Sequence, residues 1–102
     1  MKATGWSCGN ITKLGGGLGI RISHSDRDAH FDRSWRTVTV VADDRVIEVP
    51  ISSSFWRRCS ELRSREIGAF LLSRGLAPWP KGRPPSLELV PEGNGRFRLE
   101  KL

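Results

Sequence analysis

One strong helix signal, between Ser64 and Gly75, most constrains how this chain of 102 residues can fold. Ser64 can accept a hydrogen bond from a backbone N–H that the first helical turn leaves unpaired, and Glu66 places a negative charge at the positive end of the helix dipole. Gly75 can adopt a positive φ just after the last turn and so end the helix. Between them, spacings of three and four residues give one apolar stripe, made of Ile67, Phe70 and Leu71. The sequence therefore predicts one principal helix with one buried face.

Segments with strand character lie on both sides of this helix. They alternate apolar and polar residues or are rich in β-branched residues, and they span residues 18–23, 35–42, 45–51, 86–90 and 96–102. Asp43-Asp44 and the turn-forming residues 91–95 predict two hairpins. Hairpins on either side of one helix predict an α+β fold. We expect a mainly antiparallel curled sheet, or a small open barrel, of about five strands packed on one principal helix.

The predicted strands leave residues 1–17 outside the regular pattern. This stretch contains Gly15-Gly16-Gly17 and shows no clear alternation, so we expect a flexible or weakly docked N-terminal segment, or at most an edge strand. Residues 18–102 are then expected to form a single α+β domain. A chain of this length buries somewhat over ~60% of the surface that it exposes when extended, which suffices for one modest core.

Two observations bear on the cellular location. No apolar run approaches the ~20 residues needed to cross a bilayer, and the start MKATGWSCGNITK lacks the apolar stretch of a signal peptide. The only cysteines, Cys8 and Cys59, suit free thiols in a reducing compartment better than a disulfide framework. The sequence therefore predicts a cytoplasmic protein without membrane association, and it carries no signature of an oligomeric state.

The positive charge is concentrated in the second half of the chain. Residues 1–50 carry seven basic and six acidic groups, whereas residues 51–102 carry ten basic and five acidic groups, so the second half holds +5 of the formal net charge of +6. An excess of this kind favours polyanionic partners, because phosphates that bind cationic side chains release their condensed counterions. The planar guanidinium of arginine, which outnumbers lysine here, suits phosphates and guanine edges.

The basic residues between positions 57 and 83 are interspersed with an aromatic residue, Trp79, as in sites that bind single-stranded nucleic acid. The segment Pro78-Trp79-Pro80 predicts a stiff, extended arm that could present the indole ring for stacking. We therefore predict a binding module for DNA or RNA, with contacts from Arg57, Arg58, Arg63, Arg65, Trp79, Lys81 and Arg83. Two other interpretations stay open: Trp79 can anchor a partner protein, or it can fold back on the core beside Phe70 while the charges form a solvated surface.

A second cluster of polar residues lies in the run HSDRDAHFDRS. Its histidines and carboxylates occupy only even positions and would face one side of an extended chain, so that they could hold Zn²⁺ or Mn²⁺ in a hydrolase: His24, Asp26, Asp28, His30 and Asp32. The alternative is a solvated connection rich in turn-forming residues. No nucleophile has a histidine base at a supporting spacing, so an enzymatic role is not favoured, and we expect no cofactor.

The run SFWRRCSELRSREIGAFLLSRGLAPWPKGRPPSLELVPEGNGRFRL, together with FDRSW at residues 31–35, resembles small stand-alone bacterial proteins of uncharacterised function. The resemblance covers residues 18–102 at most. It implies a compact cytoplasmic domain, and it transfers no activity, catalytic residue or cofactor to this chain.

Overall fold

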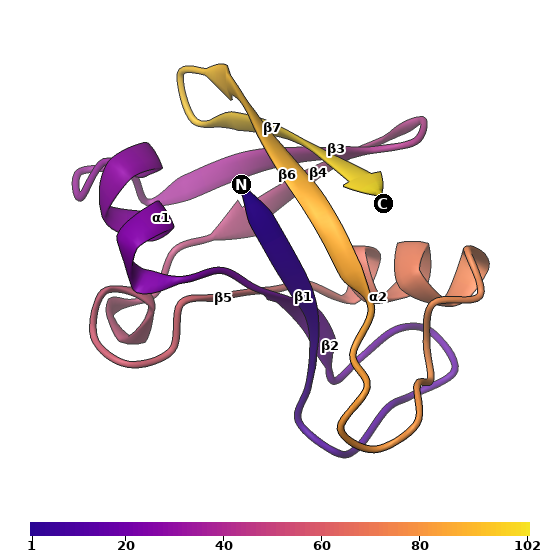
Figure 1. Cartoon of the computed structure of the whole chain (residues 1–102). Coiled ribbons are helices and arrows are strands. Elements are labelled where there is room, and N and C mark those ends of the chain that lie inside the picture. The colour runs from indigo at the N-terminus through magenta and orange to yellow at the C-terminus, as the bar shows by residue number, and fades with distance from the viewer.

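The computed structural model describes residues 1–102 and consists of one seven-stranded sheet with two α-helices (Figure 1). The helices are α1 (His24–His30) and α2 (Arg65–Ser73), and a 3₁₀ helix, η1, spans Ser53–Trp56. The strands are β1 (Lys2–Ser7), β2 (Leu18–Arg21), β3 (Thr37–Ala42), β4 (Arg45–Pro50), β5 (Glu61–Arg63), β6 (Ser86–Gly93) and β7 (Arg96–Lys101). No helix is both long and apolar enough to cross a membrane.

The sheet curls into a nearly closed barrel. Its strand order is β4-β3-β7-β6-β1-β2-β5, and the two end strands, β4 and β5, approach each other. Five neighbouring pairs are antiparallel, whereas β3 and β7 run parallel. The predicted α+β class is thus confirmed. The prediction of about five strands was wrong, and so was the antiparallel detail, because the chain has seven strands in a mixed sheet.

The first strand accounts for part of this difference. Instead of a flexible, weakly docked or edge segment, residues Lys2–Ser7 form β1, which pairs with β2 on one side and with β6 on the other. Its inward side chains are small, since Ala3 and Gly5 face the barrel interior. A strand with such inner residues shows no large apolar alternation, and this is why the sequence pattern did not reveal it.

Helix α2 forms where its sequence signals predict it. The Ser64 hydroxyl accepts hydrogen bonds from the backbone N–H groups of Glu66 and Ile67 at 3.1 and 3.4 Å. The helix buries Ile67, Phe70 and Leu71, as expected, and also Gly68. A Cβ atom at Gly68 would overlap the carbonyl of Gly15. The triple-glycine segment is therefore packed directly on the helix backbone and is not a free joint.

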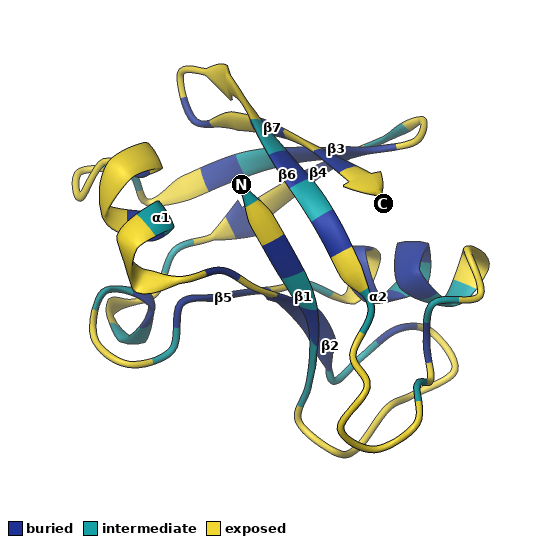
Figure 2. Ribbon diagram, viewed as in Figure 1, coloured by how far each residue is buried: buried dark blue, intermediate teal, exposed yellow.

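The core contains 20 buried hydrophobic residues on the inner side of the barrel (Figure 2). Four aromatic rings gather at one end of it. The Phe31 ring stacks on Phe97 with centroids 4.6 Å apart and packs against Phe55 at 5.0 Å and against Trp35 at 6.1 Å. Phe31 and Trp35 belong to the connection between α1 and β3, whereas Phe55 lies in η1 and Phe97 in β7, so these contacts attach that connection to the barrel.

Candidate functional site

The structure separates the seven predicted nucleic-acid contacts. Arg57 and Arg58 follow η1 in the segment 52–60, on the left in Figure 1, whereas the loop 76–85, with Trp79, lies at the lower right. Arg63 lies on β5 and Arg65 is the first residue of α2, and these two elements lie between the segment 52–60 and the loop 76–85 in the chain. The segments that carry the predicted residues therefore do not meet at one point of the surface.

The loop after α2 is not an extended arm. It turns where the backbone N–H of Arg83 donates a hydrogen bond to the carbonyl of Pro80 at 2.9 Å. Trp79 is partly buried and packs against the core, and its ring lies so close to Gly5 that a side chain there would collide with it. Lys81 and Arg83 are exposed. The indole therefore covers the end of the barrel and presents less stacking surface than an extended arm would give.

The segment predicted to be extended and metal-binding is helix α1. In a helix, alternate positions do not share a face, so the premise for a ligand set of His24, Asp26, Asp28, His30 and Asp32 was wrong. No group of three or more histidine, cysteine, aspartate or glutamate side chains could hold a metal ion.

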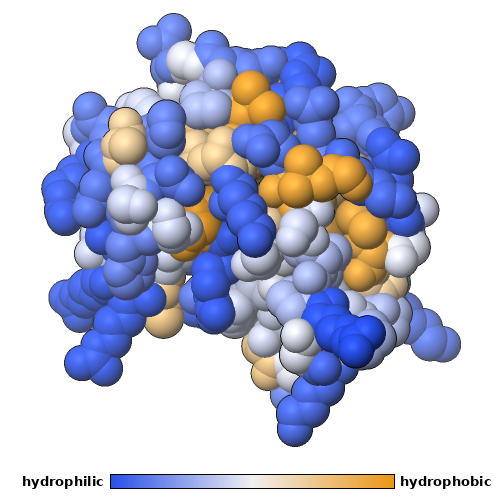
Figure 3. Space-filling model, in the orientation of Figure 1, coloured by the Kyte–Doolittle hydropathy of each residue, from blue (hydrophilic) through white to orange (hydrophobic).

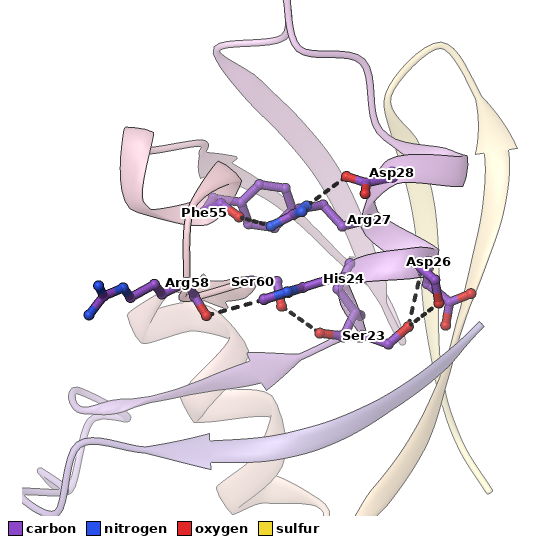
Figure 4. Close-up of polar contacts among 10 residues, drawn as sticks. Ser23, His24, Asp26, Arg27, Asp28, Phe55, Arg58 and Ser60 are labelled. Carbon is purple, nitrogen blue, oxygen red and sulfur yellow. Dashed lines mark hydrogen bonds and ion pairs between the residues drawn. The ribbon is translucent and has the colours of Figure 1, made fainter.

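Helix α1 instead contacts η1 and the segment that follows it (Figure 4). His24 Nε2 lies 3.2 Å from the carbonyl oxygen of Arg58, and the buried Arg27 donates from Nη1 to the carbonyl of Phe55 at 3.1 Å. Arg27 also pairs with Asp28 at 3.0 Å. These contacts position the Arg57-Arg58 turn against α1, while the Arg58 side chain points away from the helix (Figure 4).

Three open concavities lie next to one another, from the α1–β3 loop past the ends of β4 and β5 to the start of α2. The first, of about 510 Å³, lies between the α1–β3 loop and η1 and shares Ile51 and Ser52 with the second, of about 240 Å³. The second shares Arg63 with the third, of about 370 Å³. The shared residues make the three concavities neighbours on the surface, and together they are here called the seam groove. Its aromatic and charged side chains are Arg33, Trp35, Arg36, Trp56, Glu61, Arg63, Trp6 and Arg65.

The first concavity combines two indoles with two arginines. The guanidinium carbon of Arg33 lies 4.6 Å from the centroid of the Trp56 ring, and the Trp56 Nε1 atom is buried without a hydrogen-bond partner. Trp35 is held by its edge contacts with Phe31 and Phe97. No acidic residue lines this concavity. It therefore presents positive charge beside fixed aromatic surface.

A turn at Asp32 shapes the segment that carries Arg33 and Trp35. The Asp32 Oδ1 atom accepts hydrogen bonds from the backbone N–H of Ser34 at 2.8 Å and from its hydroxyl at 2.6 Å. These two bonds, the hydroxyl bond first, lower the pKa of Asp32, because they favour the ionised carboxylate; desolvation opposes them. Asp32 therefore stays ionised at neutral pH and stabilises this turn.

We expect Ser34→Ala to raise the pKa of Asp32 toward its ordinary value, because the variant loses the hydroxyl donor and keeps only the backbone one. The pKa can be followed by NMR titration of the Asp32 carboxyl carbon. Ser73→Ala is a matched control, since the Ser73 hydroxyl donates to the Phe70 carbonyl in α2. An unchanged Asp32 pKa in Ser34→Ala would contradict the assigned cause.

The third concavity rests on a register of three strands. Trp6 of β1 lies opposite Gly19 of β2, which lies opposite Arg63 of β5. Because Gly19 has no side chain, Arg63 reaches across it, and its guanidinium carbon lies 4.5 Å from the centroid of the Trp6 ring. Arg65, at the start of α2, lines the same concavity. The sheet register thus creates a second arginine–tryptophan pair in the seam groove.

Glu61 is the only acidic side chain of the seam groove. Its side chain is 3% exposed, and its two oxygens accept from different arginines: Oε1 from Arg63 Nη2 at 2.8 Å, and Oε2 from Arg21 Nε at 3.1 Å. A buried carboxylate is tolerated only when it is paired and hydrogen-bonded, as here. Its negative charge is therefore compensated within the protein.

Sequence reasoning found Arg63 and Arg65 but missed most of the groove. The missed residues are Trp6, Arg33, Trp35, Arg36, Trp56 and Glu61. A local signal was available, because tryptophan is followed directly by arginine in both SWR at 34–36 and FWRR at 55–58. Comparisons of the chain with protein-family models, with curated proteins and with solved structures found no match.

Proposed function

We propose that this protein binds nucleic acid, DNA or RNA, along the seam groove. The observation that carries the proposal is the set of three neighbouring concavities, in which arginine and tryptophan side chains recur from the α1–β3 loop to the start of α2. Guanidinium groups bind backbone phosphates, and indole rings offer apolar faces to bases and sugars. An elongated polyanion with flat apolar groups is the ligand class that uses both.

The charge balance of the groove supports the same ligand class. Four arginines line it against the single carboxylate of Glu61, which is already paired with two arginines. Arg57 and Arg58 directly follow Trp56 and are exposed, so they extend the positive surface beyond the first concavity. The face of the molecule drawn in Figure 3 is mostly hydrophilic, with hydrophobic surface in separate patches. Phosphate binding to such a surface weakens with salt.

We expect Arg33→Ala/Arg36→Ala to weaken binding of a labelled oligonucleotide of about 12 nucleotides and to lower the slope of log affinity against log salt by about 1–2, since each lost phosphate contact lowers it by roughly 0.7–0.9. Fluorescence anisotropy at four or more salt concentrations gives both quantities.

The matched control, Lys81→Ala/Arg83→Ala, removes the same charge from the loop after α2, outside the groove. A smaller effect of this control supports the groove. Equal effects of the two double variants would mean that charge alone determines binding. Absence of wild-type binding at low salt, for both DNA and RNA, would refute the proposed function.

A further inference from the structure

The guanidinium of Arg63 is fixed from two sides. The Trp6 ring lies under it, with 4.5 Å between the guanidinium carbon and the ring centroid, and Glu61 accepts a hydrogen bond from its Nη2 atom. The Arg63 side chain is still 51% exposed, so part of the guanidinium surface remains open to the seam groove. An arginine held in this way presents a flat, positively charged face in one orientation.

We infer that an unpaired nucleobase stacks on this open face of Arg63, and that Glu61 is the positioning residue that keeps the face toward the groove. The inference rests on the proposed function and names its substrate class, which is single-stranded rather than duplex nucleic acid. In a duplex both faces of a base are covered by its neighbours, whereas an unpaired base has a free face for an arginine plane.

The position of Glu61 is difficult to explain by the needs of a polyanion site alone. A carboxylate in such a site repels phosphate, and its burial costs free energy that only good pairing offsets. Here both carboxylate oxygens accept hydrogen bonds. One bond comes from Arg63 on the same strand, β5, and the other comes from Arg21 on the neighbouring strand, β2. The carboxylate therefore removes rotational freedom from Arg63 before the ligand arrives, so that less entropy is lost on binding.

Gly19 completes the arrangement. It lies between Trp6 and Arg63 in the register of β1, β2 and β5, and its Cα approaches the backbone of β5 so closely that a Cβ would overlap the carbonyl of Leu62. A side chain at this position would occupy the space across which Arg63 reaches the indole. Strand β2, which separates Trp6 from Arg63, therefore has no side chain at the position where these two residues meet.

The decisive variant is Glu61→Gln, because two interpretations predict opposite signs. If Glu61 only repels phosphate, its neutralisation raises the affinity for a single-stranded 12-nucleotide DNA. If Glu61 positions Arg63, affinity falls by about fivefold or more, because part of a base-stacking contact is lost. The control is Glu100→Gln, an exposed carboxylate on β7 without an ion pair, which removes the same charge. A rise in affinity for Glu61→Gln, as in this control, would overturn the inference.

A second variant, Arg63→Lys, keeps the charge and loses the planar group, so it tests stacking even if Glu61→Gln folds poorly. We expect it to bind the single strand about tenfold more weakly and to bind inorganic polyphosphate, which has no bases, as wild type does. Equal weakening for both ligands would show that the planar guanidinium contacts phosphate and not a base, and unchanged binding of both would show that only the charge at this position matters or that Arg63 makes no contact. Either result would overturn the inference, while the proposed function would stand. Failure of wild type to bind any oligonucleotide would refute both.

Discussion

Replacing Gly68 with alanine is expected to destabilise the protein by about 3 kcal/mol, at the upper end of the usual cost of overpacking. In an exposed helix the same replacement stabilises by about 1 kcal/mol, because alanine restricts the unfolded chain and favours helical dihedrals. The sign is reversed here because the new Cβ would overlap the carbonyl of Gly15. Gly15 cannot easily retreat, since it has a φ of +99° and packs against the backbone of α2 at Arg65 and Ala69.

The free energy of unfolding from urea denaturation, with the m-value as a check on two-state behaviour, measures this effect. Gly75→Ala is the control. Gly75 has a φ of +69°, but no heavy atom lies within 4 Å of the position that a Cβ would occupy, so its replacement should cost about 1 kcal/mol through backbone strain alone. A Gly68→Ala variant as stable as wild type would show that the glycine segment can move away from α2.

Phe31→Ala is expected to cost about 3–5 kcal/mol of unfolding free energy, the range for large-to-small changes in a packed aromatic core. Phe31 is 7% exposed and contacts Phe55, Phe97 and Trp35 at once. Its removal leaves a cavity among three rings that come from separate elements, and these cannot collapse together without moving the barrel wall.

Urea denaturation again gives the measurement, with Leu14→Ala as the control. Leu14 is 71% exposed, so its truncation should change stability by no more than about 0.5 kcal/mol. Because Phe31 also supports Trp35, the variant should bind the oligonucleotide more weakly under conditions in which it remains folded. A stability loss below about 1 kcal/mol would mean that the aromatic cluster repacks.

The parts of the fold that the sequence predicted are those with local causes. Helix α2 follows from its cap at Ser64 and its apolar stripe, and both are set by neighbouring residues. The hairpin of β3 and β4 follows from the Asp43-Asp44 turn, where Asp43 adopts a φ of +56°. Such signals require no knowledge of the rest of the chain.

The parts that were missed have causes elsewhere in the structure. Helix α1 has no apolar stripe, and it docks through the buried Arg27, whose partner Phe55 is 28 residues away. The parallel pairing of β3 with β7 produces no recognisable pattern in the sequence of either strand. The same holds for the candidate site, since the contact of Trp6 with Arg63 depends on a register across three strands. Composition indicated a cationic surface with aromatic residues, but only the register shows which of them meet.

The strand order has a consequence for how the chain folds. β7 lies between β3 and β6, and β1 pairs with β6. The barrel wall is therefore continuous only after Ala3 of β1 has paired with Leu87 of β6. The hairpins β3–β4 and β6–β7 can form early because their loops are short, whereas the pairing of the first strand closes a loop of most of the chain. A topology with such a high contact order folds on a timescale of roughly milliseconds to seconds. Until that last pairing forms, the edges of β1 and β6 stay open to other chains, which makes this interval the one most exposed to aggregation.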